Sequence, residues 1–244
     1  MTPRPDGGTA GRSHDPTGTL PAAVLWDMDG TLVDTEPSWM AAEAALVGEH
    51  GGEWTEHDAL QMIGLPLPAA AKILQGHGVD LPVEVITERL VDGVSEAISR
   101  HVEWQPGALE LLVALRHAGV PCALVTMSYR RLAATVVAAA PQGSFAAVVT
   151  GDEVTFGKPH PEPYLRAAQM LGVDVRECVA IEDSPPGIGS ALAAGASTLG
   201  VEHIAPVVAA PGLSRVGSLA EIDLGDLARI ASGEVIDLLV RSGA

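Results

Sequence analysis

The chain has 244 residues, of which 14 are basic and 31 are acidic, so its formal charge is −17. A chain this acidic is a poor candidate for binding nucleic acid, because contacts to phosphates need clustered Lys and Arg. Only eight residues are aromatic, so a base-stacking surface is not expected either. The length suits one large domain, or one domain that carries a smaller insert.

No segment of the sequence predicts a membrane span or a signal peptide, because no apolar run approaches the roughly 20 residues of a spanning helix. Residues 1–19 are rich in Gly, Pro, Thr and Asp, and we expect them to form a disordered tail. Cys122 and Cys178 both lie in apolar runs, which indicates reduced core residues of a cytoplasmic protein. We therefore expect no membrane partner, while the oligomeric state stays open.

The first half of the chain predicts one strand followed by helices. Residues 22–26 form an apolar run whose two faces are both hydrophobic, as in a central strand of a parallel sheet. Residues 37–103 then show helical patterns and no strand pattern. These helices are predicted over Ser38–Val47, Glu56–Ile63, Pro68–Gln75 and Val83–Ser99. We expect an all-helical cap domain at 37–103, inserted into a core domain formed by 20–36 and 104–244.

From Pro106 onward, a helical pattern that ends at a glycine is followed by a short apolar strand, three times. A glycine at the end of a helix suits the left-handed conformation that helix C-termini favour. The helices are predicted at 109–118, 161–171 and 184–194, each followed by a strand, at 121–125, 178–181 and 197–201; a fourth pair is predicted at 130–140 and 146–149. This alternation predicts an α/β fold with an open parallel, Rossmann-like sheet.

Two acidic residues, Asp27 and Asp29, follow the first predicted strand directly. Their spacing lets both side chains project to one side of the chain. Ligands bind at the carboxyl ends of the strands in open α/β sheets. Two carboxylates beside an apolar run are costly unless a cation or a proton compensates them. The pair is therefore a candidate site for a bound cation.

The run Asp27–Thr35 resembles the first motif of the haloacid dehalogenase superfamily of phosphohydrolases, in which a hydrophobic strand precedes Asp-x-Asp-Gly-Thr. Together with Glu36, it looks like the branch that includes phosphoglycolate phosphatases and β-phosphoglucomutases. The resemblance extends from about Leu20 to the end of the chain. It implies that Asp27 is the nucleophile that becomes an aspartyl-phosphate. Asp29 would then protonate the leaving oxygen and activate the hydrolytic water.

Three later residues match further positions of this family. Thr126 ends a predicted strand and corresponds to a hydroxyl that binds the phosphoryl group, although the pattern alone also allows a simple helix cap. Met127 stands where relatives often carry a polar residue, and its backbone N–H can reach a phosphate oxygen. Lys158, one of two lysines, lies between Gly and Pro in a stiff loop. The resemblance assigns Lys158 the neutralisation of nucleophile and phosphate.

Glu182 and Asp183 follow a predicted strand at the sheet edge expected for Asp27. Oxygen ligands without His or Cys favour Mg²⁺. The resemblance implies that Asp183 binds the metal together with the Asp27 carboxylate and the Asp29 backbone carbonyl. Glu182 would bind directly or through one water. The alternative, favourable placement of acids at a helix N-terminus, accounts for only one of the two.

We therefore predict a Mg²⁺-dependent phosphatase that hydrolyses a small phosphorylated metabolite. The alternatives are a phosphosugar mutase of the β-phosphoglucomutase type and, on the same scaffold, a non-catalytic binding protein. Such mutases carry a His where this chain has Trp39, and the loop 62–68 lacks an Arg or Lys for a second phosphate. Trp39, Met62, Leu65 and Leu67 are expected to face the substrate. Because they are apolar, they indicate a small or partly apolar leaving group.

Overall fold

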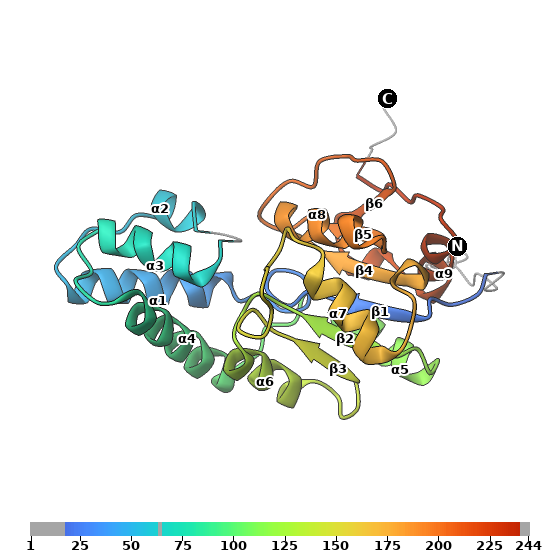
Figure 1. Ribbon diagram of the computed structural model, residues 1–244, viewed down its shortest axis with the longest axis horizontal. Coiled ribbons are helices and arrows are strands. Elements are labelled where there is room, and N and C mark those ends of the chain that lie inside the picture. The colour runs from blue at the N-terminus through green and yellow to red at the C-terminus, as the bar shows by residue number, and fades with distance from the viewer. Residues whose placement is uncertain (1–17, 63–64, 240–244) are drawn as a thin grey trace, which may run out of the picture.

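A computed structural model describes residues 18–62 and 65–239 (Figure 1). Most of the tail expected at 1–19 therefore lies outside the described residues. The first half contains β1 (Ala23–Trp26), α1 (Glu36–Glu49), α2 (Glu56–Leu60), α3 (Leu67–Gly76), α4 (Val83–Arg100) and α5 (Ala108–His117). The second half contains β2 (Cys122–Val125), α6 (Arg130–Ala139), β3 (Ala147–Val149), α7 (Glu162–Leu171), a 3-10 turn at Val175–Glu177, β4 (Cys178–Glu182), α8 (Pro185–Ala194), β5 (Ser197–Val201), β6 (Leu213–Val216), a 3-10 turn at Leu219–Glu221 and α9 (Leu224–Ala231).

The described strands form one parallel sheet in the order β3-β2-β1-β4-β5-β6. Both faces of β1 are buried, as its apolar run predicts. Val24 and Trp26 pack on one face against α5, α6 and α9, while Ala23 and Leu25 pack on the other against α7 and α8. Successive side chains of a strand point to opposite faces, so a strand covered on both sides needs a continuous apolar run. The predicted α/β fold with an open parallel sheet is confirmed.

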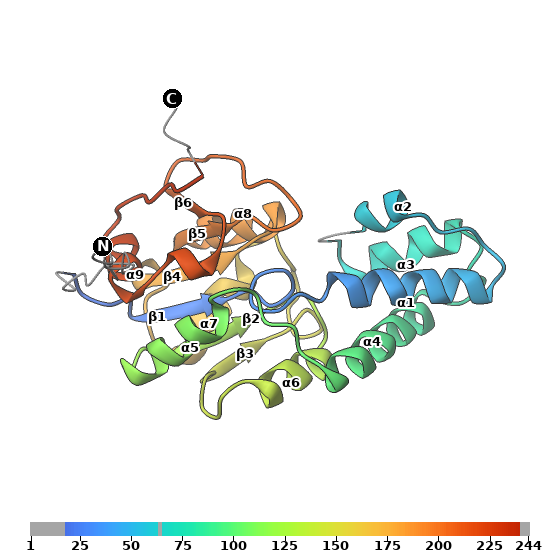
Figure 2. The ribbon, with the colours of Figure 1, turned by 180° about the vertical axis from the view of Figure 1, so that it is seen from behind.

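Helices α1 to α4 lie together as a lobe beside the sheet (Figures 1 and 2). They enclose a hydrophobic cluster drawn only from residues of this lobe, including Leu46, Leu74, Ile86 and Leu90. Two connecting segments join the lobe to the sheet and pair with each other. The N–H of Asp34 donates to the carbonyl of Glu103 at 2.8 Å, and the N–H of Gln105 donates to Leu32 at 3.0 Å. Helix α4 also packs against α6, where Val94 and Ile98 share a buried cluster with Leu132, so the lobe is attached through the paired crossing and through this helix contact.

Some element boundaries differ from the predicted ones. Helix α1 begins at Glu36, two residues early, because Pro37 fits the first helical turn, where its missing N–H has no partner to lose. Helix α2 ends at Leu60, and residue 63 of the longer predicted helix lies outside the described residues. Strand β6 and helix α9 were not predicted. Strand β6, Leu-Ser-Arg-Val, is short and polar, so it lacked the apolar run that identified the other strands.

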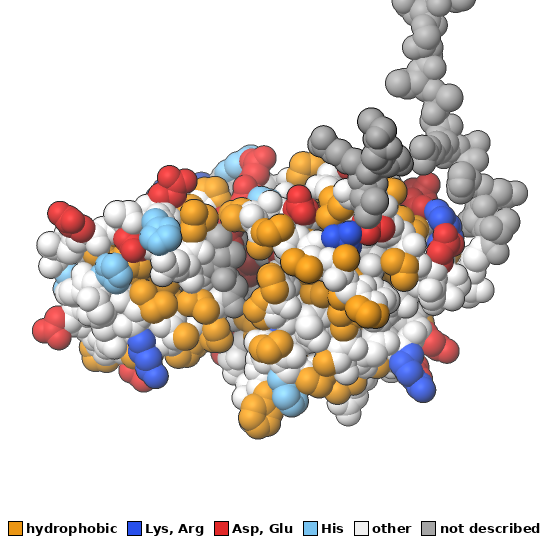
Figure 3. Space-filling model, turned by 90° about the horizontal axis from the view of Figure 1, so that it is seen from above, with side chains coloured by type: hydrophobic (Ala, Val, Ile, Leu, Met, Phe, Trp, Pro, Cys, Tyr) orange, Lys and Arg blue, Asp and Glu red, His pale blue; other side chains and the backbone are white. Residues whose placement is uncertain are grey.

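The surface agrees with the strongly acidic composition. In the view of Figure 3, acidic side chains are spread over both lobes and few basic side chains lie among them. None of the described helices combines the length and the hydrophobicity needed to cross a bilayer.

Candidate active site

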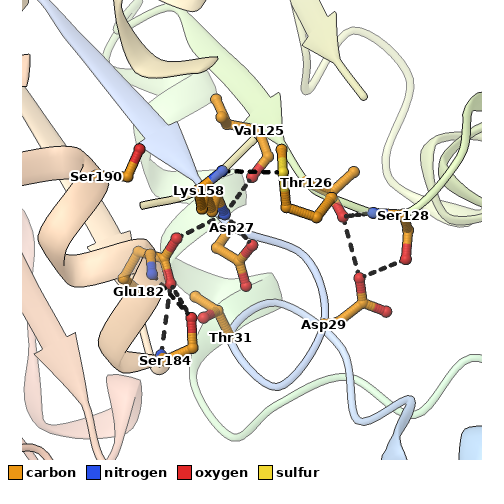
Figure 4. A network of polar contacts seen from close by, with 12 residues as sticks. Asp27, Asp29, Thr31, Val125, Thr126, Ser128, Lys158, Glu182, Ser184 and Ser190 are labelled. Atoms are coloured by element: carbon orange, nitrogen blue, oxygen red, sulfur yellow. Dashed lines mark hydrogen bonds and ion pairs between the residues drawn. The ribbon is translucent and has the colours of Figure 1, made fainter. Parts of the chain in front are cut away.

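Asp27 lies where the central strands of the sheet end. In the parallel register, Trp26 of β1 lies beside Leu124 of β2 and Ile181 of β4. The residues that follow these strands therefore meet at one edge of the sheet (Figure 4). Asp27 is buried there, with only 6% of its surface exposed. Parallel pairing thus brings together residues that are about 100 and 150 positions apart in the sequence.

The ammonium group of Lys158 makes three short contacts with residues at this edge of the sheet. Its Nζ lies 2.5 Å from Asp27 Oδ1, 2.6 Å from Glu182 Oε1 and 2.9 Å from the carbonyl oxygen of Val125. Burial alone would lower the pKa of the ammonium, but the carboxylates of Asp27 and Glu182 raise it. Lys158 is therefore held as a fixed positive charge beside Asp27.

Glu182 is fully buried and each of its oxygens is engaged. The hydroxyl of Tyr164, on α7, donates to Oε1 at 2.6 Å, and the hydroxyl of Ser184 donates to Oε2 at 3.1 Å. The Lys158 ammonium also lies 5.3 Å from the centre of the Tyr164 ring. Glu182 is therefore the second carboxylate, after Asp27, that pairs with Lys158. It helps to hold the Lys158 ammonium beside Asp27.

Asp183 lies on the other side of Asp27, against the tight turn that follows β1. The hydroxyl of Thr31 donates to Asp183 Oδ1 at 3.0 Å. Gly30 has a φ of +81°, and a Cβ at this position would lie 2.2 Å from Asp183 Oδ2. Only glycine satisfies both the left-handed backbone and the close approach of the carboxylate. Burial and the neighbouring Glu182 raise the pKa of Asp183 to about 7.

The acidic cluster at this edge fits a divalent cation. Carboxylate oxygens of Asp27, Glu182 and Asp183 all lie within 4.8 Å of one another. Burial, and after it the charge of Glu182, raises the pKa of Asp27 well above its usual value. Three buried carboxylates face a single ammonium, so negative charge is left uncompensated. A set of oxygen ligands without His or Cys suits Mg²⁺.

The Asp29 carboxylate is turned away from this cluster, toward β2 and α1 (Figure 4). Its Oδ2 accepts hydrogen bonds from the hydroxyls of Thr126 at 3.0 Å and Ser128 at 2.8 Å. Its Oδ1 accepts from the hydroxyl of Thr35 at 2.7 Å and from the indole N–H of Trp39 at 3.4 Å. Among the acidic residues expected at the metal, Asp29 is thus the one whose carboxylate points elsewhere, and the binding of the ion by its backbone carbonyl stays a prediction.

A cavity of about 110 Å³ opens above these residues, between the sheet edge and the helical lobe. Its floor includes Asp27, Lys158 and Asp183. Six of the seven residues expected to contact the substrate line it, namely Trp39, Met62, Leu65, Leu67, Met127 and Lys158. Thr126 is not among the lining residues; its hydroxyl donates to Asp29 and accepts the N–H of Ser128 at 2.9 Å. The structure therefore brings the predicted residues together at one site, with Thr126 just behind its wall.

Comparison with known proteins identifies the family. The sequence pattern of haloacid dehalogenase-like hydrolases matches residues 21–195. The chain belongs to this family. The hydrolase is 32% identical to hexitol phosphatase A of Escherichia coli, over 72% of this chain and 81% of that protein. It is 30% identical, over 76% of its length, to the bifunctional riboflavin kinase/FMN phosphatase of Arabidopsis thaliana, of which it spans about half (49%).

The solved structures show the same architecture. A HAD hydrolase of family IA, variant 3, from Entamoeba histolytica superimposes with a TM-score of 0.77 at 22% identity, covering 86% of this chain and 99% of that one. This likeness concerns the fold. The family and the relatives named as phosphatases establish that the protein is a hydrolase of phosphomonoesters.

Several residues of this hydrolase's site were not predicted from the sequence. Tyr164 and Ser128 support Glu182 and Asp29, but a lone Tyr in a helix or Ser after a strand gives no signal by itself. Glu36 and Glu43 line the cavity beside the apolar residues. Their spacing of seven positions on α1 placed them on one helical face, which was a usable signal. The cavity wall supplied by the helical lobe therefore combines the expected apolar residues with two acidic residues that were not expected.

Proposed function

We propose that this hydrolase is a Mg²⁺-dependent phosphatase that cleaves a small-metabolite phosphomonoester, such as a sugar phosphate, through an aspartyl-phosphate on Asp27. The observation that carries the proposal is the position of Asp27. It is buried at the floor of the cavity, 2.5 Å from the fixed ammonium of Lys158 and within the oxygen cluster that includes Asp183. A cavity of about 110 Å³ suits a small substrate rather than a macromolecule.

In the first step, a carboxylate oxygen of Asp27 attacks phosphorus and the bond to the leaving oxygen breaks. Lys158 balances negative charge on the phosphoryl oxygens as the attack proceeds. Asp29, which also lines the cavity, donates a proton from its protonated form to the leaving oxygen, and in doing so exchanges a hydrogen bond with Thr126 or Ser128. The leaving group departs as a neutral alcohol, and the phosphoryl group stays on Asp27.

In the second step, the Asp29 carboxylate accepts a proton from water, and the water oxygen attacks phosphorus. The acyl-phosphate bond breaks, which returns the Asp27 carboxylate and releases inorganic phosphate. Asp27, Asp183 and the backbone carbonyl of Asp29 would hold Mg²⁺, with Glu182 behind them. When bound, the ion neutralises charge on the phosphoryl group and on the acidic cluster.

The decisive experiment replaces the nucleophile. Asp27→Asn is nearly isosteric but cannot attack phosphorus, so phosphate release from sugar phosphates should fall by about 10⁴-fold or more. Asp80→Asn, an exposed carboxylate in the helical lobe, is the matched control and should keep full activity. Excess chelator should abolish wild-type activity, and added Mg²⁺ should restore it. Substantial turnover by Asp27→Asn would contradict the covalent mechanism.

We also infer a small-metabolite partner and a cytoplasmic location. Cys122 and Cys178 are both free and buried, in β2 and β4, which suits a reducing compartment. Location stays a prediction, to be checked by fractionation of cells that express the native protein.

A further inference from the structure

The helical lobe places an acidic side chain in the wall of the cavity, and one of its carboxyl oxygens is without a hydrogen-bond partner in the described part of the chain. Glu36, Met40 and Glu43 lie along one face of α1 and all line the cavity. Glu43 is only 5% exposed. Its Oε2 is buried and has no hydrogen-bond partner among the described residues. An unsatisfied buried carboxyl oxygen is rare in folded proteins and calls for an explanation.

The surroundings of Glu43 do not compensate its charge. The helical lobe also contributes the apolar side chains of Ala59, Met62, Leu67 and Leu90 to the lining of this cavity. Burial accordingly raises the pKa of Glu43 to about 7, although the nearby indole N–H of Trp54 acts to lower it. Burying such a group costs stability unless something pairs with it. The indole N–H of Trp54, itself buried without a partner within hydrogen-bond distance elsewhere in the described structure, can serve only one lone pair of the carboxyl group. A donor for the remaining lone pairs is therefore expected to come from a ligand.

The charge of the cavity limits what that ligand can be. Among the described lining residues, Lys158 is the single Lys or Arg, and it is bound to Asp27 and Glu182. Glu36 faces the same space as Glu43, and burial followed by the charge of Asp29 raises its pKa to about 7. A second phosphate or a carboxylate on the leaving group would meet these acids with no cation to pair with. Hydroxyl groups would instead donate to them.

We propose that Glu43, with Glu36 beside it, forms a subsite that recognises hydroxyl groups on a neutral, polyhydroxylated leaving group. The inference rests on the proposed phosphatase function, whose floor residues hold the phosphoryl group at the other end of the cavity. It goes beyond that function, because it names the group that distinguishes one phosphomonoester from another. Leaving groups that carry a second anion, such as a carboxylate, are disfavoured.

A binding experiment tests the subsite without turnover. In the Asp27→Asn background with Mg²⁺, calorimetry should show that sorbitol 6-phosphate binds at least about tenfold more tightly than phosphoglycolate. Adding Glu43→Leu should weaken the binding of sorbitol 6-phosphate by about 10- to 100-fold, because a hydroxyl group of the ligand then loses a buried acceptor. Glu49→Leu is the matched control, because Glu49 lies on the exposed side of α1 and pairs with Arg89 at 3.0 Å. Glu43→Leu replaces an unpaired acid by an apolar group, so the variant should fold.

Kinetics with the active enzyme identify which group of the substrate donates a hydrogen bond to Glu43. Glu43→Leu should lower kcat/KM for sorbitol 6-phosphate about tenfold or more relative to p-nitrophenyl phosphate, which has no hydroxyl donors, and mainly through KM. Glu43→Gln should lower it only a few-fold, since the amide oxygen still accepts an O–H. A wild-type preference for phosphoethanolamine that Glu43→Gln removes would identify an ammonium donor and overturn the hydroxyl assignment.

The outcomes separate this inference from the proposed function. If Glu43→Leu lowered kcat/KM equally for sorbitol 6-phosphate and for p-nitrophenyl phosphate, the subsite would be overturned. The proposed phosphatase function would not be affected. Binding of phosphoglycolate as tightly as sorbitol 6-phosphate would also overturn the subsite without affecting the phosphatase function. Conversely, Glu43-dependent binding of sorbitol 6-phosphate to a protein that hydrolyses no ester would support the subsite and contradict the phosphatase.

Discussion

Asp27 and Asp29 are two positions apart and yet have different surroundings. Asp27 is paired with Lys158 and shares its space with Glu182 and Asp183. Asp29 instead accepts hydrogen bonds from neutral donors, with Thr126 and Ser128 at one oxygen and Thr35 and Trp39 at the other. Neutral donors stabilise a carboxylate without fixing a cation beside it, and each bond is weak enough to exchange. These surroundings suit a nucleophile held in place and an acid–base group that moves.

Glu43 gives a prediction for stability against pH. Burial raises its pKa from 4.5 to about 7, so between these values the native state binds the proton more tightly than the unfolded state does. The stabilisation is fully present below about pH 4.5 and is lost as the pH rises to about 7. The glutamine of Glu43→Gln does not titrate, so this variant does not lose that stabilisation. As the pH rises from about 4.5 to about 7, its free energy of unfolding should therefore increase relative to that of the wild type, by at most about 3 kcal/mol.

Urea unfolding of the ligand-free proteins at pH 5 and pH 8 measures this difference. Glu49→Gln, on the same helix, is the control for a Glu-to-Gln change outside the cavity. A constant difference between Glu43→Gln and wild type at the two pH values would show that Glu43 is not desolvated in solution.

Helix α8 shows how one element shapes the site. The Ser184 side chain caps its first turn by accepting the N–H of Gly187 at 3.2 Å, and Pro185 fits the first helical position. The same serine donates to Glu182, so the cap and the carboxylate are linked. The helix ends at Gly195, whose φ of 90° is the left-handed conformation expected from the sequence.

The two glycines inside α8 should respond oppositely to alanine. A Cβ at Gly187 would lie 2.0 Å from the carboxyl atoms of Glu182, which Lys158 and Tyr164 hold in place. Gly187→Ala should therefore destabilise the protein by about 2–3 kcal/mol and lower activity, despite the better helix propensity of alanine.

Gly189→Ala is the matched control within the same helix. Its Cβ would meet only Pro159 Cβ, at an ordinary 3.7 Å, so it should stabilise by up to about 1 kcal/mol. Chemical denaturation compares the two variants. If Gly187→Ala were as stable as Gly189→Ala, Glu182 would not be rigidly held.

At the scale of the whole molecule, the cavity belongs to both lobes. The sheet edge supplies Asp27, Lys158 and Asp183, and the helical lobe supplies Trp39 and Glu43. The lobes are joined by the paired crossing near Asp34 and Glu103 and by the packing of α4 against α6. The proposed nucleophile and the proposed recognition group therefore lie on different lobes.

This arrangement favours hydrolysis over the mutase alternative. A phosphosugar mutase must hold a second phosphate, and among the described lining residues only Lys158 is basic. We predict that β-glucose 1-phosphate yields free phosphate and no glucose 6-phosphate. Phosphoenzyme formed from acetyl phosphate should decay within seconds, with or without hexose phosphate. Efficient isomerisation with little phosphate release would overturn this prediction; Asp27→Asn should give neither product.

Much of the protein follows from the sequence because its signals are local. The apolar run before Asp27 and the glycines at 119, 172 and 195 predicted the parallel sheet and most of its helices. The run Asp27–Thr35 predicted the family, since a strand followed by a tight acidic turn is encoded by adjacent residues.

Other features depended on the tertiary structure because they join distant segments. The Tyr164 hydroxyl meets Glu182 only when α7 packs on the sheet over β1, β2 and β3, and Thr126 meets Asp29 only through the pairing of β1 with β2. The acidity of the cavity wall was also decided there, because packing of the helical lobe buries Oε2 of Glu43 with no hydrogen-bond partner among residues 18–62 and 65–239. A carboxyl in a helix is normally solvated, and only its surroundings in the fold make it a recognition group.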